Sequence, residues 1–97
     1  SGIAKYPSVT RDISMVVPKS ILVGQIEDVI EKKGGKILES YSLFDIYEGN
    51  QILSGHKSVA YSITFRAADR TLEDKDVTDA MNKILKALGE LGIQLRS

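Results

Sequence analysis

The 97-residue sequence contains no cysteine, no tryptophan and only one histidine. The absence of cysteine excludes disulfide scaffolds, thiolate zinc sites and thiol catalysis, and it fits the reducing cytoplasm, where we expect this protein to act. No apolar run approaches the ~20 residues of a membrane-spanning helix, and the first residues lack the pattern of a signal peptide. Lysine plus arginine (13) equals aspartate plus glutamate (13), so the basic excess typical of a free-standing nucleic-acid binder is also missing.

The chain does have the size and balance of one globular domain. With 42% hydrophobic and 27% charged residues, residues 1–97 are expected to bury one core without a metal or a disulfide. The single histidine, His56, lies in a glycine-containing stretch, and the chain has no other histidine or cysteine to complete a metal site. Neither a metal site nor a serine–histidine–aspartate triad is therefore predicted.

Alternation of apolar and polar residues predicts four strands. These segments are residues 11–17, 36–50, 57–66 and 93–96. In the second segment the alternation slips between Tyr41 and Phe44, which predicts a β-bulge. The apolar residues expected to anchor that strand to the core are Leu43, Phe44 and Ile46.

Apolar residues at helical spacing predict two helices, over residues 20–36 and 71–92. The first is expected to begin with Ser20 as its N-cap, to bury Leu22, and to end at Gly34. The second is expected to begin with a capping box formed by Thr71 and Asp74.

This order of elements, β-α-β-β-α-β, predicts an α+β fold of the ferredoxin-like, split β-α-β type. Each helix has only one apolar stripe, so both must pack on the same face of a four-stranded antiparallel sheet. The other sheet face is then left open.

The side chains that alternation places on the open face are mostly small and polar. They are Asp12, Ser14, Val16, Asp45, Tyr47, Ser58, Ala60, Ser62, Thr64, Gln94 and Arg96. A base could stack on Tyr47, Asp45 could accept hydrogen bonds from the Watson–Crick edge of guanine, and Arg96 could meet a phosphate or a base. The alternative is that solvation alone accounts for polar residues on an open face. The pattern by itself therefore leaves the function open.

Four segments together resemble a known family, the ferredoxin-fold anticodon-binding domain of the bacterial phenylalanyl-tRNA synthetase β subunit. They are KYPSVTRDISMVV (5–17), FDIYEG (44–49), GHKSVAYSITFRAADRTLEDKDV (55–77) and GIQLR (92–96). The similarity covers nearly the whole chain, in order and at family spacing. Each segment is weak evidence alone, but the set is specific.

The resemblance implies that the open face binds the anticodon of phenylalanine tRNA. The family's base-contacting positions fall on Asp45, Tyr47, Ser58, Ala60 and Arg96, with Ser14, Ser62 and Arg11 as secondary contacts. Arg11 could instead form an ion pair with a nearby carboxylate, and this structural role is the interpretation that we favour. The implied parent is an α2β2 ATP-dependent ligase whose catalytic residues, ATP and magnesium belong to the α subunit. The resemblance therefore implies that this chain alone has no catalytic residues, no cofactor, and neither DNA nor a membrane as a partner.

Two alternatives share the predicted fold. Acylphosphatases are enzymes with an arginine and a glycine-rich anion loop between the first strand and the first helix, where this sequence has VPKSILVG. Small-molecule regulatory domains have a glycine-rich strand–helix turn, which this sequence also lacks. Hydrolysis of an acyl phosphate would separate the first alternative from RNA binding.

Overall fold

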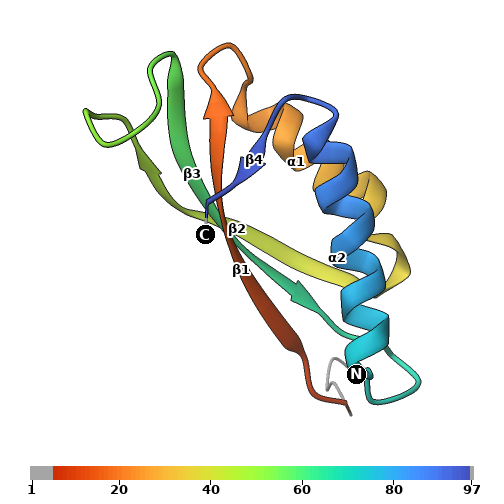
Figure 1. Cartoon of the computed structure of the whole chain (residues 1–97). Coiled ribbons are helices and arrows are strands. Elements are labelled where there is room, and N and C mark those ends of the chain that lie inside the picture. Colours follow the sequence, from red (N-terminus) through yellow and green to blue (C-terminus); the bar gives the residue numbers. More distant parts are fainter. Residues whose placement is uncertain (1–5, 97) are drawn as a thin grey trace.

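The computed structural model describes residues 6–96 and confirms the predicted order of elements. These are β1 (Val9–Pro18), α1 (Val23–Lys33), a 3-10 turn (Gly35–Ile37), β2 (Leu38–Tyr47), β3 (His56–Phe65), α2 (Asp74–Gly89) and β4 (Gln94–Leu95). The strands form one antiparallel sheet in the order β2-β3-β1-β4. Both helices lie on the same side of it, as Figure 1 shows. The predicted ferredoxin-like α+β fold is therefore confirmed.

The core lies between the sheet and the helices, and β3 runs through its centre. The β3 side chains that face the helices are completely buried: Val59, Tyr61, Ile63 and Phe65. The helices cover them with Ile26, Ile30, Val77, Ile84 and Leu88. Strict alternation in β3 therefore separates a buried face from the face that the helices leave uncovered.

Helix α1 begins later than the sequence predicted. The Ile21 N–H donates to the Pro18 carbonyl (3.0 Å), so a turn holds the segment that contains Ser20. The Leu22 N–H is capped instead by the Gln25 side chain (2.8 Å). Ser20 is thus not the N-cap, and Leu22 is 65% exposed rather than buried.

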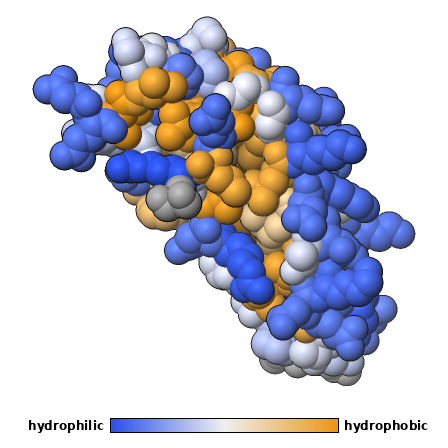
Figure 2. Space-filling model, in the orientation of Figure 1, coloured by the Kyte–Doolittle hydropathy of each residue, from blue (hydrophilic) through white to orange (hydrophobic). Residues whose placement is uncertain are grey.

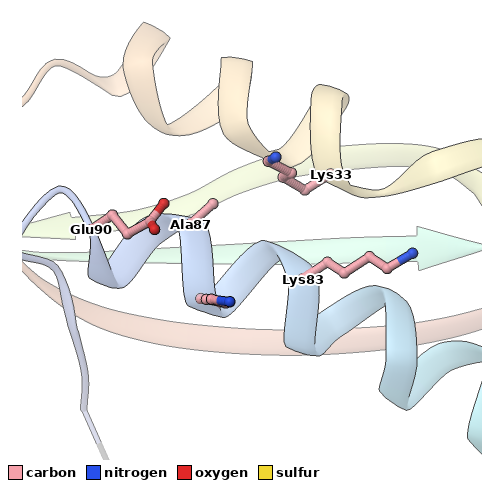
Figure 3. A pocket seen from close by; sticks show the side chains of 5 residues that line it. Lys33, Lys83, Ala87 and Glu90 are labelled. Carbon is pink, nitrogen blue, oxygen red and sulfur yellow. The ribbon is translucent and has the colours of Figure 1, made fainter.

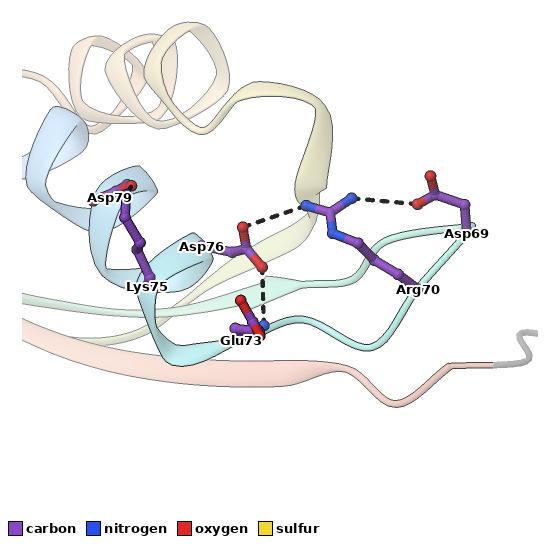
Figure 4. Close-up of polar contacts among 6 residues, drawn as sticks. All are labelled: Asp69, Arg70, Glu73, Lys75, Asp76 and Asp79. Atoms are coloured by element: carbon purple, nitrogen blue, oxygen red, sulfur yellow. Dashed lines mark hydrogen bonds and ion pairs between the residues drawn. The ribbon is translucent and has the colours of Figure 1, made fainter.

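The capping contact of α2 also differs from the prediction. The Asp76 carboxylate accepts the Glu73 N–H (2.9 Å) and a weaker hydrogen bond from Arg70 (3.4 Å), as Figure 4 shows. The Glu73 N–H, with help from Arg70, lowers the pKa of the Asp76 carboxyl. The capping box therefore lies two residues after the predicted pair of Thr71 and Asp74, because α2 itself begins at Asp74.

Strand β2 is an outer strand of the sheet, and the helices cover only part of it. Leu43, Phe44 and Ile46 are 39%, 56% and 51% exposed, so the prediction that they anchor β2 to the core is wrong. The reason is length: the 11 residues of α1 span ~16 Å, whereas the 10 residues of β2 span ~33 Å. Figure 2 shows apolar surface at the end of the sheet that carries the β2–β3 loop.

Two tyrosines of the sheet donate hydrogen bonds to carboxylates of α1. Tyr61 donates to Glu27 (2.7 Å), and Tyr41 donates to Glu31. Burial, together with the bond to Glu27, raises the pKa of the Tyr61 phenol. The bond to Glu31 is the largest cause that raises the pKa of Tyr41, to about 12. These contacts connect α1 to β2, through Tyr41, and to β3, through Tyr61.

Because both phenols have a higher pKa in the folded chain than in the unfolded one, their contribution to stability is complete below pH ~10. It is lost as the pH rises through the folded pKa of each group. We expect Tyr41→Phe and Tyr61→Phe each to flatten the fall in the free energy of unfolding between pH ~10 and 12. At pH 7, Tyr61→Phe is expected to cost ~1–2 kcal/mol, since the Glu27 carboxylate loses a donor. Urea unfolding at several pH values would measure the free energy of unfolding of parent and variants. An equally steep fall in parent and variant at high pH would contradict the prediction.

Candidate nucleic-acid interface

The sheet register places the predicted site residues in two adjacent rows on the open face. The first row runs Tyr47, Ser58, Val16 and Gln94 across all four strands. The second runs Asp45, Ala60 and Ser14 across three. Directly opposed residues in such rows have Cβ atoms ~4.5–5.5 Å apart. Side chains that are far apart in the sequence therefore form one continuous surface, here called the open-face site.

A β-bulge in β2 is what turns Asp45 and Tyr47 to this face. Leu43 pairs with Tyr61, and Asp45 pairs with Ala60, the residue just before Tyr61 in the sequence. Phe44 has no partner in β3 and is the extra residue of the bulge. Without the bulge, Asp45 would be paired with Val59, whose side chain points into the core, and Phe44 would take its place on the open face. The predicted bulge is confirmed, and it moves the side chains of the following residues to the opposite face.

The side chains in the middle of the open-face site are short and nearly inaccessible to solvent. Ser58 and Ala60 are only 5% and 4% exposed, whereas Tyr47 is 45% exposed and Asp45 is also on the surface. Polar and aromatic groups thus stand at the edge of a floor made of small side chains. A flat ligand can approach the backbone of β3 closely at this floor.

Arg96 closes the opposite side of this floor. Its backbone N–H donates to the Ser14 carbonyl (2.8 Å), which continues the pairing of β4 with β1. Its side-chain Nη1 donates to the Ser58 hydroxyl (3.1 Å). The guanidinium is thereby held over the floor, facing the strand that carries Asp45 and Tyr47. Sequence reasoning placed Arg96 on this face, but the contact with Ser58 carries no signal in the sequence.

The secondary positions divide between the two faces. Ser14 lies in the second row, and Ser62 lies one row further, paired with Asp12 and Ser42. Arg11 is paired with Ile63, whose side chain is in the core, so the register places Arg11 on the side of the sheet that carries the helices. The structure therefore brings Ser14 and Ser62 together with the open-face site and leaves Arg11 apart from it.

Other polar side chains have structural partners. Arg66 donates to Glu39 (2.7 Å) and to the Tyr6 carbonyl (2.8 Å), which ties the end of β3 to β2 and to the segment that precedes β1. His56 Nδ1 lies 2.8 Å from the Ser54 carbonyl oxygen. Residues 6–96 contain no group of three or more side chains that could hold a metal ion. Within the same residues, no helix is long and apolar enough to cross a membrane.

A second concave region lies on the helix side, with a volume of about 310 Å³. Figure 3 shows Lys33 of α1 and, facing it, Lys83 and Ala87 of α2 and Glu90, the residue that follows α2. Lys86 also lines it. Exposed lysines beside one carboxylate provide charge without a buried, oriented polar group, so the open-face site is the better-built candidate.

Comparisons with known proteins find a matching family model and several similar relatives. Residues 4–96 match the family model of the ferredoxin-fold anticodon binding domain. The chain is 52% identical over 96 residues to a phenylalanine–tRNA ligase beta subunit of Clostridium acetobutylicum, covering 98% of this chain and 12% of that protein. It is 48% identical over 88 residues to the corresponding subunit of Bacillus subtilis, covering 91% of this chain and 11% of that protein. The chain thus spans about an eighth of the length of these relatives.

Proposed function

We propose, from the premise that this chain belongs to the ferredoxin-fold anticodon binding domain family, that its open-face site binds the anticodon stem-loop of phenylalanine tRNA. The observation that carries this proposal is the pair of adjacent rows that brings Tyr47, Asp45, Ser58 and Ala60 together with the Arg96 guanidinium. Sequence-specific proteins read RNA mainly at unstacked loop bases, which they stack on aromatic rings and hydrogen-bond at their edges. This surface offers both kinds of contact side by side.

Each part of the site has a distinct task in this proposal. The first anticodon base, a guanine, stacks on the exposed Tyr47 ring. The Asp45 carboxylate accepts hydrogen bonds from the guanine N1–H and N2–H groups. The Watson–Crick edges of adenine and uracil cannot reproduce this pairing, because neither has two adjacent donor groups. Ser58 and Ala60 leave room for the loop to lie close to the sheet. Arg96 donates to a second base or to a phosphate, since its guanidinium has further N–H donors besides the one on Ser58.

We further propose that the chain is one domain of a longer β subunit that works with an α subunit in an α2β2 phenylalanine–tRNA ligase. Both relatives named above are β subunits of that ligase. In this proposal the α subunit carries the catalytic residues and uses ATP and magnesium in the cytoplasm, while this domain needs no cofactor. The net charge of zero fits this proposal, because the domain would add selectivity for the anticodon while other parts of the enzyme bind the tRNA phosphates.

Base reading is tested by titrating the chain with a phenylalanine anticodon stem-loop and with a copy whose first anticodon base is adenine. We expect the guanine form to bind more tightly by ~1–3 kcal/mol, the discrimination of a good bidentate base contact. Asp45→Ala should abolish the preference, because it removes the acceptor that reads the base. Asp28→Ala is the matched control, since it removes an exposed carboxylate of α1 on the other side of the sheet. Equal binding of both stem-loops by the parent chain would rule out base reading at this position.

A further inference from the structure

The turn that follows β2 has a glycine whose missing side chain makes room for the Tyr47 ring. A Cβ atom added to Gly49 would lie only 2.8 Å from Tyr47 Cζ and 3.2 Å from Cε2. Carbon atoms in ordinary contact are ~3.5–4.0 Å apart, so the ring already rests against the backbone of this turn. The described glycines with positive φ are Gly35, Gly55 and Gly92. Gly49 is therefore required for space rather than for its backbone conformation.

The backbone around Gly49 is held in place by contacts of the turn itself. Its carbonyl accepts the Ile52 N–H (3.0 Å), and Ile52 is 8% exposed, so the turn is anchored by a buried side chain. Glu48 forms an ion pair with Lys19 (3.2 Å) just beyond β1, although both side chains are half exposed and the pair is weak. The ring is 45% exposed, so it can turn towards solvent, whereas the hydrogen-bonded backbone of the turn cannot yield without losing a contact. A side chain at position 49 would therefore displace the ring.

We propose that Gly49 is a positioning residue for Tyr47. Its bare backbone forms a support against which the ring settles in one orientation, at the edge of the Ser58 and Ala60 floor. Cross-strand neighbours cannot provide this support, because Tyr47 lies at the end of an outer strand and its paired residue is only a serine. Holding the ring before a ligand arrives reduces the entropy that binding would otherwise cost. The consequence for RNA rests on the proposed function, whereas the position of the ring does not.

Gly49→Ala tests this in two independent measurements. In the free chain, we expect the ring-proton chemical shifts of Tyr47 to move, while the melting temperature stays near that of the parent. With the stem-loop, we expect affinity to fall about fivefold or more, towards that of Tyr47→Ala. In a chain that already carries Tyr47→Ala, adding Gly49→Ala should change affinity no further. Gly24→Ala is the matched control, because a Cβ at Gly24 meets no atom within 4 Å.

The outcomes separate this proposal from the proposed function. Unchanged Tyr47 shifts in Gly49→Ala would overturn the positioning role, whether or not RNA binds. Shifted resonances with undiminished affinity, when Tyr47→Ala is impaired, would overturn its part in binding. An equal loss of affinity from Gly49→Ala in the Tyr47→Ala chain would also overturn it, since the glycine would then act independently of the ring. A parent chain that binds no stem-loop would overturn the proposed function, and the chemical shifts alone would then decide the positioning role.

Discussion

Replacing Tyr47 with alanine lowers the affinity of the chain for the phenylalanine anticodon stem-loop by roughly 5- to 150-fold, if a base stacks on the ring. The range follows from the ~1–3 kcal/mol that one base–aromatic stack contributes. The fold should tolerate the change, because the ring is 45% exposed and lies at the end of an outer strand. Isothermal titration or fluorescence anisotropy with a labelled stem-loop would measure the loss.

Two control variants make the Tyr47 result specific. Tyr47→Phe keeps the ring and loses only the hydroxyl, so it should retain most of the affinity. Phe44→Ala removes another exposed aromatic of β2, at the bulge residue that has no partner in the β3 ladder. It should change affinity much less than Tyr47→Ala. Affinity that is unchanged in Tyr47→Ala would contradict stacking at this position.

Phe65→Ala is expected to destabilise the domain most severely. Phe65 has no exposed surface and belongs to the single core, and the loss of a buried phenylalanine side chain costs ~3–5 kcal/mol. A domain of this size has ~5–15 kcal/mol of stability in total. At about 4–8 °C per kcal/mol, the melting temperature should fall by at least ~12 °C. Thermal unfolding followed by circular dichroism would measure the change.

A neighbour of Phe65 on the opposite sheet face provides the comparison. Ser62 is partly exposed and its register partners, Asp12 and Ser42, are polar. Ser62→Ala should therefore change the free energy of unfolding by less than ~0.5 kcal/mol. Similar losses for Ser62→Ala and Phe65→Ala would mean that the two faces of β3 do not differ as the structure indicates.

Local patterns in the sequence were most reliable along the regular strands. Alternation in β3 correctly predicted which side chains face the helices, since a pleated strand sends successive side chains to opposite sides. Helix ends were less predictable: both Ser20 and Thr71 looked like N-caps, yet the N-caps lie two residues later, at Leu22 and Glu73. A turn at Pro18 precedes the first, and the Asp76 carboxylate completes the second. Several residues near each end could have made the first capping contact, and packing of the whole helix selects among them.

The open-face site likewise combines features that the sequence predicted with features that only tertiary packing establishes. Hydrophobic periodicity was sufficient to establish four strands, two one-sided helices and an uncovered sheet face, because these depend on which side chains avoid water. It also located the bulge, through the slip in alternation before Phe44. The exposure of Leu43 and Ile46, the Arg96–Ser58 contact and the Tyr47 ring lying against Gly49 depend on how far each element extends and on what its neighbours cover. Such contacts join residues distant along the chain or across a turn, so they exist only once the sheet register and the helix packing are in place.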